Sequence, residues 1–176
     1  MKNKTKNTAV SGLLTALSVV LMMLTTVIPV FMYVLPIATG LLVLLVAEIT
    51  DKKWAFGVYL STSVLALLLL TDKEAALTYA LIFGYYPLIK DNLDKKKKPF
   101  SVLLKLLIFN CAAVIIGYLG VALLGVSGEE YKEFGKITVP LLLSMANVAF
   151  FMYDIMLKKY GFLITHFGKK ISRKMK

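Results

Sequence analysis

The sequence predicts an all-α membrane protein: a polytopic bundle of six transmembrane helices whose N- and C-termini both lie inside. Two observations predict this fold class. Of the 176 residues, 59% are apolar, and they gather in blocks of about 15 to 25 residues, the length that crosses a bilayer. Short charged segments separate the blocks, and the lysines gather in alternate segments, a distribution that fixes the orientation of membrane helices.

The apolar blocks define six spans in order along the chain. The first follows three lysines and is longer than the apolar region of a usual signal peptide, so we expect it to be retained as a helix. A short turn bracketed by Pro29 and Pro36 leads into the second. The predicted spans are 9–28, 32–49, 54–70, 75–89, 101–125 and 137–157. No connecting segment is long enough to fold separately, so we expect one transmembrane domain over residues 1–176.

The basic residues test both the number of spans and their direction. If the chain starts inside and crosses at every block, only Lys73, Lys132 and Lys136 of the 21 basic residues fall outside, and the other 18 fall inside. One miscounted span would exchange the sides of all later segments and remove this asymmetry. Membrane orientation therefore explains the net charge of +11, and nucleic acid is not an expected partner. We expect a multi-pass protein of the bacterial cytoplasmic membrane.

Two basic segments lie on the predicted inner side. The loop over 91–99 holds four consecutive lysines; it is expected to meet the lipid surface, and a docking surface for a cytoplasmic partner is the alternative. The tail over 160–176 mixes aromatic and aliphatic residues with basic ones. This mixture predicts an amphipathic helix that anchors the cytoplasmic tail at the membrane interface.

Residues that catalysis needs are scarce within the predicted spans. The only histidine, His166, lies in the tail, and the only cysteine, Cys111, lies inside an apolar block. No two metal ligands lie four residues apart on a span, and neither a nucleophile elbow nor a glycine-rich phosphate loop is present. We therefore expect no enzymatic activity, no metal and no cofactor.

Two carboxylates, Glu48 and Asp154, lie near the predicted inner ends of spans, beside lysines. Ionisable residues inside a membrane are functional candidates, but lysines such as Lys52 and Lys158 are close enough in sequence to form interfacial salt bridges. Both interpretations, salt bridging and proton relay, stay open. Glu74 has a structural explanation, because Thr71 and Glu74 have the spacing of a capping box at the start of the fourth span.

Polar residues share one depth in the last three spans. Tyr79, Tyr118 and Ser144 lie about 10 Å below the predicted outer surface, and Asn147 lies one turn deeper. Hydroxyls and an amide in one layer predict a pocket for a small, partly aromatic ligand. The alternative is hydrogen bonding between helices, and Asn110, which lies deeper, is expected to pair in this way with Asn147 or with its neighbours.

The first span carries small residues near its inner end. Ser11 and Thr15 form one pair four residues apart, and Gly12 and Ala16 form another. Such a strip lets a second helix approach closely. We expect it to contact a partner helix, either within this chain or on another protein.

With its basic start, small-residue strip and six spans, the chain resembles the substrate-binding S components of energy-coupling factor transporters. The resemblance implies contact between the strip and a transmembrane coupling subunit, separate ATPases that supply energy, and a vitamin-like small-molecule ligand in the outer half. No motif assigns a particular vitamin. Alternatives are a scaffolding membrane protein without a ligand and a proton-coupled carrier that uses Glu48 or Asp154.

Overall fold

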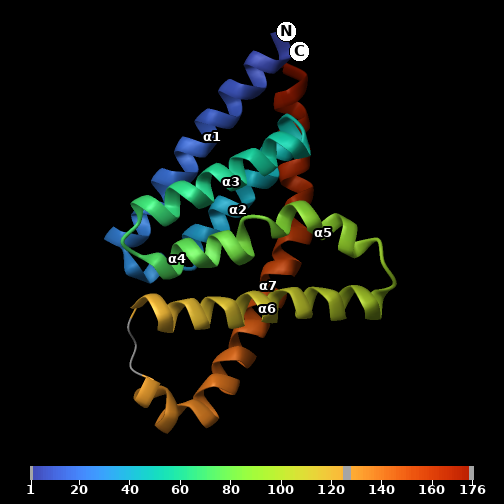
Figure 1. The fold of residues 1–176 in the computed structure, drawn as a ribbon. Coiled ribbons are helices and arrows are strands. Elements are labelled where there is room, and N and C mark those ends of the chain that lie inside the picture. Colours follow the sequence, from blue (N-terminus) through green and yellow to red (C-terminus); the bar gives the residue numbers. More distant parts are fainter. Residues whose placement is uncertain (1, 125–127, 175–176) are drawn as a thin grey trace. The chain divides into compact units, whose positions relative to one another are not determined.

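The computed structural model of the protein describes residues 2–124 and 128–174, and all of its regular elements in these ranges are helices (Figure 1). The chain divides into two compact units. The large unit comprises Met1–Asp91 with Met156–Lys176, and the small unit comprises Asn92–Ile155. The predicted all-α class is therefore confirmed.

Three helices form the centre of the large unit and lie side by side in Figure 1. They are α1 (Lys2–Val27), α2 (Val34–Ile49) and α3 (Lys52–Leu69). A single 3-10 turn, η1 (Pro29–Phe31), joins the first two, because Pro29 supplies no amide hydrogen at this first helical position. The shared core is apolar and includes Met22, Val43, Val46, Ala55 and Val58. The spans predicted over 9–28, 32–49 and 54–70 thus lie in helices.

The predicted fourth span is not one uninterrupted helix, which corrects the expectation for 75–89. The chain forms α4 (Lys73–Thr78), then a π-helix, η2 (Tyr79–Phe83), and after a turn α5 (Tyr86–Asp94). The π-helix widens the backbone, and Tyr59 donates a hydrogen bond of 2.8 Å to its Ala80 carbonyl. Gly84 follows because a Cβ there would lie 2.6 Å from the Tyr59 ring.

The turn before α4 uses a different capping residue from the one predicted. Asp72, not Thr71, is the N-cap, and its carboxylate accepts a bond of 3.0 Å from the Ala75 amide. The Glu74 carboxylate instead accepts a 2.7 Å bond from the Tyr33 hydroxyl.

The sixth predicted span and the predicted tail form one helix. Helix α7 runs from Gly128 to Lys174 without a break, and its 47 residues belong to both units. The predicted tail over 160–176 is helical as far as Lys174, the last described residue, and is continuous with the helix of the sixth span. Within the large unit this part of α7 packs on α2: Gly161 lies against Leu44, and Thr165 donates a 3.1 Å bond to the Glu48 carboxylate. Anchoring of the tail at the membrane interface stays a prediction.

The small unit consists mainly of α6 (Lys98–Leu124) and the adjoining part of α7. The rings of Phe109 and Phe150 stack between these helices with centroids 4.5 Å apart. The predicted fifth span, 101–125, corresponds to α6, except for residue 125, which lies outside the described residues.

Three stretches in the described part of the chain are long and apolar enough to cross a membrane: Lys4–Val27, Lys98–Gly120 and Val139–Ile171. Large apolar side chains on them are exposed, as at Leu13 (71%), Leu103 (61%) and Met145 (63%). Contiguous apolar surface of this kind is costly in water and is satisfied by lipid. These helices therefore indicate a membrane protein.

Gly168→Ala should destabilise the large unit, because the added Cβ would lie 2.6 Å from the Cβ of Glu48. We expect a loss of about 1–3 kcal/mol in unfolding free energy. Gly161→Ala is the matched control, since its Cβ would meet Leu44 at an ordinary contact distance of 3.9 Å. Thermal unfolding in detergent compares the two variants, and equal melting temperatures would contradict the packing of α7 on α2.

Candidate functional site

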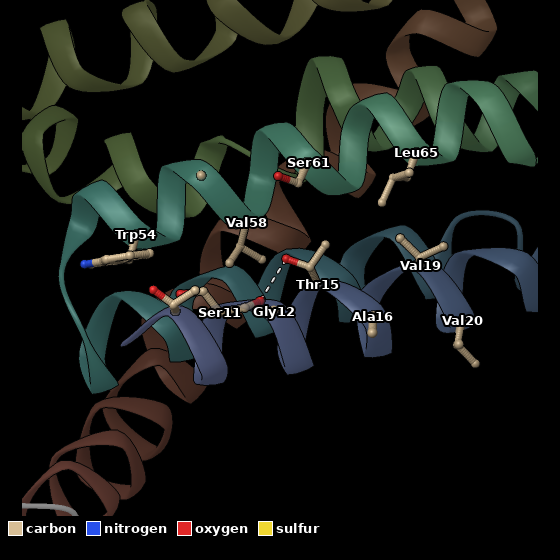
Figure 2. A pocket seen from close by; sticks show the side chains of 12 residues that line it. Ser11, Gly12, Thr15, Ala16, Val19, Val20, Trp54, Val58, Ser61 and Leu65 are labelled. Carbon is tan, nitrogen blue, oxygen red and sulfur yellow. Dashed lines mark hydrogen bonds between the residues drawn. The ribbon is translucent and has the colours of Figure 1, made fainter. Parts of the chain in front are cut away.

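An open groove of about 650 Å³ runs between α1 and α3 in the large unit (Figure 2). Trp54 lies toward one end, and Val20 and Leu65 toward the other. Small side chains line the part between them: Ser11, Gly12, Thr15 and Ala16 of α1, and Gly57 and Ser61 of α3. All four small residues predicted on the first span therefore line one groove.

The groove is open because its walls lack bulk. A Cβ placed on Gly12 or on Gly57 would meet nothing within 4 Å. Leu13, one residue after Gly12, is 71% exposed and does not line the groove. The small residues are thus gathered on the side of α1 that faces α3, where they leave space that this part of the chain does not fill.

Two of the hydroxyls that line the groove already form hydrogen bonds within their own helix. The Thr15 hydroxyl donates a 2.8 Å bond to the carbonyl of Ser11, within its own helix (Figure 2), and the Thr8 hydroxyl bonds Lys4 in the same way at 3.0 Å. Ser11 is buried, and its own hydroxyl has no hydrogen-bond partner among the described residues. The groove therefore fits an apolar, closely approaching occupant such as a helix.

That α3 also lines the groove was not predicted from the sequence. Gly57 and Ser61 are separated by four residues, the same spacing as Gly12 and Ala16. That spacing puts two small residues on one side of a helix. The signal was therefore present in the sequence, although only a three-dimensional arrangement places both pairs on one groove.

The predicted ligand residue Tyr79 lies in the core of the large unit, on the π-helix. It is 0% exposed, and its hydroxyl has no hydrogen-bond partner among the described residues. The Thr62 hydroxyl of α3 is likewise buried without a hydrogen-bond partner among the described residues. A buried hydroxyl without a partner is costly, and π-helices are frequent at functional sites.

The other three predicted ligand residues lie in the small unit. Tyr118 is 74% exposed, and Ser144 is exposed as well. The amides of Asn147 and Asn110 exchange two hydrogen bonds of 3.0 Å between α7 and α6. The predicted pairing of these asparagines is confirmed. A pocket shared with Tyr79, which belongs to the other unit, stays a prediction.

The two carboxylates near the predicted inner ends are both engaged. In the small unit, the Lys105 ammonium lies 3.0 Å from Asp154 and 2.5 Å from Asp94. Only 8% of the Lys105 side chain is exposed. Glu48 accepts the bond from Thr165 in the large unit. Asp154 thus forms a salt bridge, but with a lysine 49 residues away that sequence proximity did not indicate.

Metal binding finds no support in the part of the chain that the structure describes. No three histidine, cysteine, aspartate or glutamate side chains lie close enough there to hold an ion. Cys111 is a free, exposed thiol.

Comparison of the chain with protein-family models, with curated proteins and with solved structures gives no match. Its function must therefore be argued from its own residues and contacts.

Lys105→Met should destabilise the small unit by about 3–5 kcal/mol, because it removes the ammonium that compensates the part-buried Asp154. Adding Asp154→Leu should restore most of this loss, since the pair is then apolar, while the Asp94 side chain is 39% exposed. Chemical denaturation in detergent micelles measures both variants. A double variant as unstable as Lys105→Met would show that the salt bridge does not explain the effect.

Proposed function

We propose that this protein is a non-enzymatic membrane subunit that captures a small, vitamin-like molecule and docks onto a transmembrane helix of a coupling subunit. Separate ATPase subunits would supply the energy for uptake, as in energy-coupling factor transporters. The observation that carries the proposal is the open groove between α1 and α3.

The groove supports docking for a physical reason. Between helices in lipid, association depends on van der Waals packing, because lipid tails are as apolar as the helices themselves. Small residues at Gly12, Ala16 and Gly57 would bring a partner backbone close to both α1 and α3. The occupant would thus contact two helices at once, which increases the packed area over that of a single strip.

The proposed orientation is six crossings with both termini in the cytoplasm. The distribution of the basic residues supports it. In this arrangement α4, the π-helix and α5 together form the fourth crossing. Their interruption is tolerable because the large unit buries it: Tyr79, Phe83 and Gly84 are all buried.

The capture role assigns ligand contact to Tyr79, Tyr118, Ser144 and Asn147. Two features support it: the buried hydroxyl of Tyr79 without a partner and the exposure of Tyr118. Binding at Tyr79 requires its packing to open, since the side chain is fully enclosed.

A scaffolding protein without a ligand is the second candidate. The observation that favours it is the Asn110–Asn147 pair, which uses the Asn147 amide between helices. In a scaffold, the groove would still bind a partner helix, but no small molecule would be retained. A proton-coupled carrier is less well supported, because Lys105 neutralises Asp154.

Gly12→Leu and Ala16→Leu test the proposal by filling the groove. Each should weaken co-purification with the coupling subunit by about tenfold, or about 1.4 kcal/mol, while the fold stays intact because the space at Gly12 is empty. Leu13→Phe is the matched control: it adds similar bulk at an exposed position outside the groove.

Native mass spectrometry of the same preparations separates the two candidate functions. A small molecule retained by the protein supports capture, and a ligand-free complex whose assembly depends on the groove supports scaffolding. If the groove variants and Leu13→Phe bind the partner equally well, docking at the groove is wrong.

A further inference from the structure

We propose that the lysines at the start of α6, Lys95 to Lys98, form with Phe100 a binding site for the phosphate headgroups of anionic lipids. This site lies in the small unit, and it does not depend on the function proposed above. The contacts of the neighbouring carboxylates, the position of the lysines at and just before the first residue of α6, and the adjacent apolar side chains carry the inference.

The positive charge of the four lysines is not compensated by neighbouring residues. All four side chains are exposed, and none makes an ion pair with a carboxylate whose side chain the structure describes. Asp94, the carboxylate directly before them, bonds Lys105 at 2.5 Å. Lys105 therefore occupies the nearest acidic group and leaves the cluster available to an external anion.

The position of the cluster matches the headgroup level of a bilayer. Lys98 is the first residue of α6, and the stretch Lys98–Gly120 is long and apolar enough to cross a membrane. Lysines directly at the end of such a helix lie beside lipid phosphates, which attract them electrostatically. A phosphate bound there would belong to one of the lipids that surround α6.

Apolar side chains begin within one turn of the lysines. Phe100 is 50% exposed and Leu103 is 61% exposed. The Lys96 ammonium lies 5.3 Å from the centroid of the Phe100 ring, which holds one charge beside this apolar surface. A phospholipid satisfies both parts, since its phosphate meets the ammonium groups and its acyl chains cover Phe100 and Leu103. An acidic protein segment would satisfy only the charges.

The test replaces Lys95, Lys96, Lys97 and Lys98 together by Gln. Purified protein is equilibrated with mixed micelles of equal phosphatidylglycerol and phosphatidylcholine, and native mass spectrometry counts the retained lipids. Wild-type protein should be enriched in phosphatidylglycerol, and the variant should lose about tenfold of this enrichment. The helical circular dichroism should not change, because the four side chains are exposed.

A second quadruple variant separates a site from an effect of net charge. Lys158, Lys159, Lys169 and Lys170 are also exposed, and their joint replacement by Gln removes the same charge from α7. This variant should keep most of the enrichment. Equal losses in both variants, or no enrichment in the wild type, would overturn the proposal. Binding of a polyglutamate peptide without enrichment of phosphatidylglycerol would likewise overturn it, in favour of an acidic protein partner.

Discussion

The structure depends on one constraint: in a chain surrounded by lipid, polar groups must find partners within the protein, because no water is available. Helices satisfy the backbone, and several hydroxyls bond carbonyls of their own helix, as Thr15 does with Ser11 and Thr39 with Leu35. Four buried hydroxyls have no hydrogen-bond partner among the described residues: those of Ser11, Ser18, Thr62 and Tyr79. Where the backbone departs from the α-helix, at the π-helix, a tyrosine hydroxyl reaches across from α3 to its Ala80 carbonyl. In the small unit, two polar pairs join α6 and α7: Lys105 with Asp154, and Asn110 with Asn147.

Glycines show how the large unit uses close approach, and where it leaves space. At Gly84 and Gly168 the space beside the backbone is filled, by the Tyr59 ring and by Glu48 respectively. At Gly12 and Gly57 it is empty. Gly117 and Gly120 of α6 are equally open, but Gly12 and Gly57 both line the groove, where the open space can admit a partner helix. This contrast, together with the lysines that no carboxylate compensates, gives the protein two distinct surfaces: an apolar one suited to a helix and a charged one suited to lipid phosphate.

The sequence predicts helices well here because apolar blocks and alternating charge are long-range averages that single residues do not disturb. The pairing of Asn110 with Asn147 is one of the contacts that the sequence predicted, because amides inside a membrane need partners on neighbouring helices. The sequence fails where a contact distant in sequence decides the geometry. The π-helix accepts a hydrogen bond from Tyr59 of α3, and Lys105 and Asp154 lie too far apart in sequence for their pairing to be predicted from neighbouring residues. The α3 side of the groove was not predicted, because Gly57 and Ser61 line a groove only when α3 lies beside α1 in the folded chain.

The central claim is that the chain crosses the membrane six times, with α1 starting in the cytoplasm; if only the three longest apolar stretches crossed, the lysines before α6 would lie outside. Single cysteines at Lys4, Lys73 and Lys96, in a chain whose exposed Cys111 is replaced by Ala, distinguish these arrangements by their reaction with a membrane-impermeant maleimide. Six crossings predict labelling of Lys73→Cys in intact cells, and of Lys4→Cys and Lys96→Cys only after permeabilisation. Labelling of Lys96→Cys in intact cells, with Lys4→Cys protected, would contradict the account.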